Sequence, residues 1–177
     1  MTVSLYDMSV GTFVPMLTSL SEVLDKGAEH ARVKGFDPAI LVEGRLAPDM
    51  YPLWRQIEIA CDTASTAIAL LQSREPPKQG EIGRSFDALK ERIRVTLESL
   101  KAVAPADLDG SETCDVTIPL PDLKAKFVFS GLEYLRDWSL PHFYFHVVTA
   151  YDILRHMGVE IGKKDYMSGV GRYIRPA

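Results

Sequence analysis

Four segments of the chain repeat apolar residues every three or four positions, a spacing that places them on one face of an α-helix. These segments lie at about residues 10–34, 49–72, 85–103 and 130–158. Asp49 is expected to cap the second segment, with Pro52 in its first turn. Four long amphipathic helices must bury their apolar faces against one another, so the pattern predicts an all-α protein built as a four-helix bundle.

The segment before the last helix changes its periodicity. At residues 114–120 apolar side chains alternate with polar residues or proline, and a second run, Lys124-Ala125-Lys126-Phe127-Val128-Phe129, follows the Pro121-Asp122 pair. Alternation with a period of two is typical of strands, and proline favours the turn between them. We therefore expect a small β-hairpin directly before the last helix.

Length and charge limit the classes of protein that the chain can belong to. The 177 residues fit a single domain over residues 1–177, and no internal repeat divides them. The net charge is −4, with no long basic run, so we expect no nucleic-acid partner. No window approaches the ~18 apolar residues that span a bilayer, so we expect no membrane partner. The two cysteines form no disulfide framework and the first residues do not resemble a secretory signal, which predicts a cytoplasmic protein.

The last helical segment carries two histidines four residues apart. His142 and His146 fall on one face of a helix, where both imidazoles can reach a single metal ion. The alternative is that both are ordinary core or rim residues in an aromatic segment. Phe143 occupies the position of the glutamate in an HExxH metalloprotease motif, which argues against zincin-type peptide hydrolysis.

A metal site would need at least one more ligand from another element. Asp62, an oxygen donor on the second helical segment, is the first candidate, and Glu58, one turn earlier, competes with it. An exposed carboxylate without a special role is the alternative for Asp62. Cys61 falls on the apolar stripe of the same helix, which favours an inert buried thiol over a reactive one.

Several segments together resemble the family DUF1993, a bacterial and fungal family of unknown function in the DinB/YfiT-like superfamily of proposed metalloenzymes. The resemblance extends from Leu5 to about Gly169 and is carried by residues 46–53, 56–62, 141–146 and 162–166. It implies a four-helix bundle of the up-down-down-up type that is usually a homodimer. It also implies a divalent metal held by a histidine on the second helix and an HxxxH pair on the last.

His142 and His146 match the HxxxH pair of this family pattern, but the second helix of this chain contains no histidine. Asp62 lies closest to the expected position, so the resemblance implies either an Asp-substituted or a degenerate site for zinc or nickel. The wider superfamily includes transferases that use low-molecular-weight thiols. We therefore expect a metal-dependent enzyme of this type. The alternatives are a non-enzymatic dimeric bundle that binds a small molecule or a partner without metal, and a thiol transferase in which Cys61 itself reacts.

Overall fold

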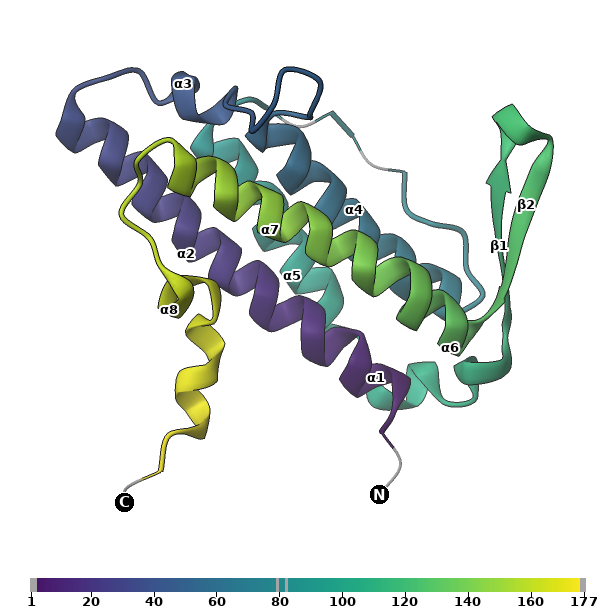
Figure 1. Cartoon of the computed structure of the whole chain (residues 1–177). Coiled ribbons are helices and arrows are strands. Elements are labelled where there is room, and N and C mark those ends of the chain that lie inside the picture. The colour runs from purple at the N-terminus through teal and green to yellow at the C-terminus, as the bar shows by residue number, and fades with distance from the viewer. Residues whose placement is uncertain (1–2, 79, 82, 176–177) are drawn as a thin grey trace.

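The computed structural model describes residues 3–78, 80–81 and 83–175, and four long helices dominate it (Figure 1). They are α2 (Val10–Lys34), α4 (Leu53–Leu71), α5 (Phe86–Lys101) and α7 (Leu140–His156). The shorter α-helices include α1 (Leu5–Met8), α3 (Ala39–Val42), α6 (Gly131–Glu133) and α8 (Lys163–Tyr166), and two strands are present, β1 (Asp115–Leu120) and β2 (Ala125–Ser130). The prediction of an all-α four-helix bundle with one hairpin is confirmed.

The long helices follow an up-down-down-up order. Arg84, just before α5, lies 3.5 Å from Glu43, and Glu43 accepts a hydrogen bond from Trp54 in the first turn of α4, so both helices begin at the same end of the bundle. Figure 1 shows α2 and α7 running in the opposite direction to α4 and α5. This arrangement places α4 between α5 and α7, and α4 packs against both.

The apolar faces predicted from the sequence meet in one continuous core. Each of the four helices contributes side chains that are almost fully buried, among them Phe13, Leu17, Leu24, Leu53, Ile57, Leu89, Ile93, Phe143 and Ile153. Burying side chains of this size contributes roughly 1.5–3 kcal/mol each. The core therefore fixes which face of each helix turns inward, and with it the side chains that two helices share.

The start of the second long helix was predicted wrongly. The helix begins at Leu53, and its N-cap is Pro52 in an extended conformation with ψ 167° rather than Asp49. Proline at this position disfavours helical geometry for the preceding residue, Tyr51, so the helix starts only after the proline. Residues 49–52 lead into the helix instead of forming its first turn.

The last helical segment is divided near Pro141. Ser130 and Glu133 form a capping box at the start of α6, which confirms the expected beginning. A π-helical segment (Tyr134–Ser139) then leads into α7, where Pro141 lies in the first turn. Because Pro141 has no N–H to donate, the regular bonding of the helix is interrupted there, and the wider turn comes immediately before it.

The predicted hairpin is also present, with β1 and β2 paired antiparallel and Ile118 opposite Phe127. Phe127 and Phe129 lie 5.3 and 6.3 Å from the ring of Trp138, so β2 packs against the π-helical segment. In the described part of the chain, no helix is both long and apolar enough to span a bilayer.

Candidate functional site between helices α4 and α7

The two histidines of α7 lie on consecutive turns of one helix face. The centroids of the His142 and His146 rings are 4.8 Å apart, and the rings meet edge to face. His142 is exposed, whereas only 6% of His146 is accessible. The pair therefore joins the interior of the bundle to its surface, and the two rings share one helix face, as their spacing in the sequence predicted.

Desolvation, greater for His146 than for His142, favours the neutral form of both imidazoles near pH 7. Desolvation lowers the pKa of His142 below its ordinary value. Desolvation also lowers the pKa of His146, to about 4, and the charge of His142, when that residue is protonated, and the positive charge of Arg55 lower it further. A neutral imidazole keeps one nitrogen lone pair free, which is the form that binds a metal ion or accepts a proton.

Gln56 of α4 is the residue that contacts His146 from the neighbouring helix. Its Oε1 lies 2.6 Å from His146 Nδ1, and its Nε2 donates to the backbone carbonyl of Tyr51 at 3.0 Å. Sequence reasoning missed Gln56, although a signal was present. The residue lies three positions after Leu53 and four before Ala60, so it interrupts the apolar stripe of α4 with a polar side chain. Only 1% of Gln56 is accessible, so the interruption is buried.

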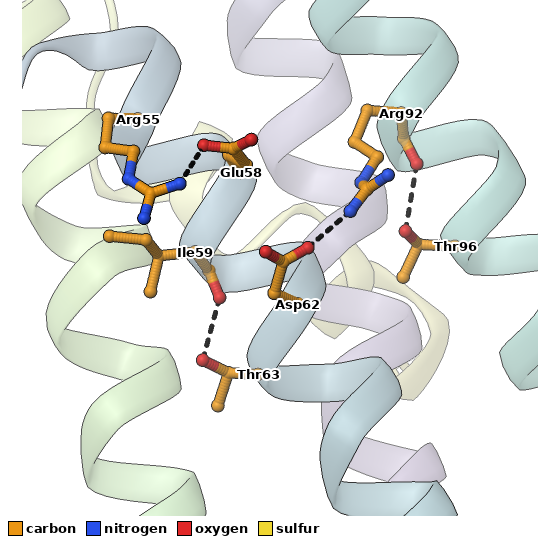
Figure 2. A network of polar contacts seen from close by, with 7 residues as sticks. All are labelled: Arg55, Glu58, Ile59, Asp62, Thr63, Arg92 and Thr96. Carbon is orange, nitrogen blue, oxygen red and sulfur yellow. Dashed lines mark hydrogen bonds and ion pairs between the residues drawn. The ribbon is translucent and has the colours of Figure 1, made fainter. Parts of the chain in front are cut away.

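Asp62 points to the other side of α4. Figure 2 shows its carboxylate directed toward α5, where Arg92 donates a hydrogen bond to Oδ1 in an ion pair. Burial raises the pKa of the Asp62 carboxyl, while the hydrogen bond and the positive charge of Arg92 lower it. Glu58, the competing candidate, forms an ion pair with Arg55 on the same helix. Each carboxylate that was predicted as a third ligand therefore has a cationic partner of its own.

The donor set near the histidines fits a metal ion only in part. Two neutral imidazoles on one helix face are suitable ligands for zinc or nickel. Among the residues that the structure describes, however, no group of three or more His, Cys, Asp or Glu side chains is arranged to hold a metal. His142, His146 and Asp62 as a complete set stay a prediction, and in this geometry Asp62 binds Arg92.

Cys61 lies at the boundary of α4 and α5, with none of its surface accessible. Burial raises the pKa of its thiol to about 12, although a hydrogen bond with Thr96 acts in the opposite direction. Because the thiolate is the reactive form of cysteine, a thiol in this setting is a poor nucleophile. The geometry favours the inert thiol over direct reaction at Cys61.

Aromatic side chains border the histidine pair. Trp138 lies 6.1 Å from the ring of His142, and Phe145 lies 5.2 Å from the ring of His146 with 57% of its surface exposed. Trp138 also contacts Phe127 of β2. The hairpin therefore packs against the turn that leads into the histidine pair.

A comparison with solved structures defines the class of this bundle. The chain is similar to a DinB family member from Shewanella denitrificans, with a TM-score of 0.87 and 37% sequence identity over 97% of this chain and 96% of the other. The fold is therefore that of a DinB-like bundle. The sequence matches DUF1993, a domain of unknown function, over residues 5–167, and the chain belongs to this family. No curated protein matches the chain.

Proposed function

We propose that this protein is a metal-dependent enzyme of the DinB type in which His142 and His146 hold a divalent transition metal, zinc or nickel. The observation that supports this proposal is the pair of neutral imidazoles on adjacent turns of α7, with ring centroids 4.8 Å apart. An ion bound there supplies Lewis acidity, which lowers the pKa of a coordinated water or thiol. We take a low-molecular-weight thiol as the co-substrate, in line with the resemblance to thiol-dependent transferases.

The side chains around the histidine pair have different roles at such a site. His142 is exposed and His146 is buried, so a ligand would approach from the His142 side. The side chain of Phe145, on the same exposed side, offers apolar contact beside the imidazoles. Asp62 joins the site only if its carboxylate leaves Arg92, so the remaining positions fall to water or to a donor atom of the substrate.

The critical test is the metal content of protein purified without a histidine tag. Wild-type protein should take up about one zinc or nickel ion per chain, while H142A and H146A should lose it. His156, an exposed histidine at the end of α7, provides the matched control, because H156A should bind metal like the wild type. Wild-type protein that contains no transition metal and takes up none from added zinc or nickel would refute the proposal.

A second candidate function is a non-enzymatic homodimeric bundle that binds a small molecule or a partner without metal. It is favoured by the ion pairs of Asp62 with Arg92 and of Glu58 with Arg55, which engage both carboxylates that were considered as third ligands. In this case H142A and H146A should change the stability of the protein but release no metal. Light scattering on the same samples measures whether the chain is a dimer.

A further inference from the structure

We propose that Gln56 is a positioning residue that holds His146 in the tautomer with its proton on Nδ1, so that the lone pair lies on Nε2, on the side of the ring away from Gln56. The metal-binding role of that lone pair rests on the proposed function. The hydrogen bonds that carry it are independent of any metal.

The orientation of the Gln56 amide is set by the backbone of Tyr51. A backbone carbonyl only accepts hydrogen bonds, so the Gln56 group that faces it at 3.0 Å must be the donating NH₂. Tyr51 precedes Pro52, and a residue before proline is restricted to extended conformations. The carbonyl is thereby held in place, and rotation of the amide by 180° would put two oxygen atoms against each other.

Because the NH₂ group of Gln56 donates to the Tyr51 carbonyl, the atom of Gln56 that faces His146 is Oε1. An amide oxygen only accepts, so His146 Nδ1, at 2.6 Å, must donate. A neutral imidazole carries a single proton. When that proton is on Nδ1, the lone pair is on Nε2, which is the nitrogen on the far side of the ring from Gln56.

Burial strengthens the preference of His146 for the Nδ1–H tautomer. Gln56 is 1% exposed and His146 is 6% exposed, so water does not replace either partner. When a buried polar group loses its only hydrogen-bond partner, nothing offsets the free energy of its desolvation. Gln56 therefore acts as an outer partner of the kind that orients a metal-binding histidine, rather than as a third ligand.

The direct test is nitrogen NMR of metal-free protein labelled with ¹⁵N-histidine, which distinguishes protonated from unprotonated ring nitrogens. In the wild type, His146 should show a protonated Nδ1 and an unprotonated Nε2. In Q56L, which removes the acceptor, the Nδ1–H form should lose its dominance. Thr149, one turn after Phe145 on α7, donates to the Phe145 carbonyl at 2.6 Å, so T149V removes a nearby hydrogen bond and should leave the tautomer unchanged.

A wild-type His146 with its proton on Nε2, or a Q56L variant with an unchanged tautomer, would overturn the assignment. Zinc binding then separates this inference from the proposed function. Loss of the orienting bond should weaken zinc affinity by about 10- to 100-fold in Q56L, with T149V near the wild type. An Nδ1–H tautomer in a protein that binds no zinc would refute the metal site and leave the role of Gln56 supported.

Discussion

Helix α4 presents polar side chains to both of its neighbours, and the two sides differ in charge and in burial. Toward α5, Asp62 and Arg92 form an ion pair whose side chains are 32% and 14% exposed. Toward α7, Gln56 and His146 form a neutral hydrogen bond at 1% and 6% exposure. One side is charged and near the surface, and the other is uncharged and inside the bundle.

This difference follows from the free energy of burying polar groups. A hydrogen-bonded amide or neutral imidazole can enter a helix interface at modest cost, whereas an ionised group requires a partner and access to water. The ion pair satisfies both of its charges and offers little to a ligand. The neutral pair leaves one imidazole nitrogen unused, so the side of α4 that faces α7 is the side suited to chemistry.

The largest change in the free energy of unfolding should come from removing the amide of Gln56, the acceptor of the neutral pair. Q56L leaves His146 Nδ1–H and the Tyr51 carbonyl without a partner, so the free energy of unfolding should fall by roughly 2–4 kcal/mol. Denaturant titration measures this change. The double variant Q56L/H146L should recover part of the loss, because two apolar partners need no hydrogen bond. Additive losses in the double variant would show that the two side chains are not coupled.

An intermediate effect should appear in the pH dependence of stability. The pKa of His146 is about 4 in the folded protein and 6.5 in the unfolded chain. Between these values the unfolded chain binds a proton that the folded protein does not, so stability falls as the pH drops from about 6.5 toward 4. The expected loss between pH 6.5 and 5 is about 2 kcal/mol.

The same titration on the H146L variant provides the comparison for this prediction. His142 and Arg55 are the charged or titrating neighbours that lower the pKa of His146, and both remain in the variant. The pH dependence of the variant should be flatter over this range. Equal slopes in the two proteins would mean that His146 titrates alike in the folded and unfolded states.

The smallest effect is expected on the charged side. D62N keeps an acceptor for Arg92 but removes the negative charge, which should destabilise the protein by roughly 1 kcal/mol. Zinc content should stay at the wild-type level if the two histidines alone hold the metal. A fall in zinc content would instead identify Asp62 as a ligand. Thr63, which donates a hydrogen bond to the Ile59 carbonyl one turn earlier on α4, supplies a control in T63V, with a change within about 0.5 kcal/mol (Figure 2).

The sequence predicted the histidine pair because two residues four apart on one helix need no tertiary information to share a face. It also predicted the hairpin and the start of the last helix near residue 130, since strand alternation and helical periodicity are local patterns. The residue on α4 that contacts the histidine pair was harder to predict, because any polar residue on α4 could have faced α7. Asp62 was chosen for its chemistry, whereas Gln56, inside the apolar stripe, is the residue that the packing brings to His146.

The sequence by itself determined the four amphipathic helices, the hairpin and the spacing of His142 and His146, because these depend on the periodicity of a single segment. Only the tertiary structure decided which polar residues meet across helices. The face of α4 that packs into the core turns Asp62 toward Arg92 and Gln56 toward His146. The whole buried core decides which face that is, so no single segment of the sequence contains it.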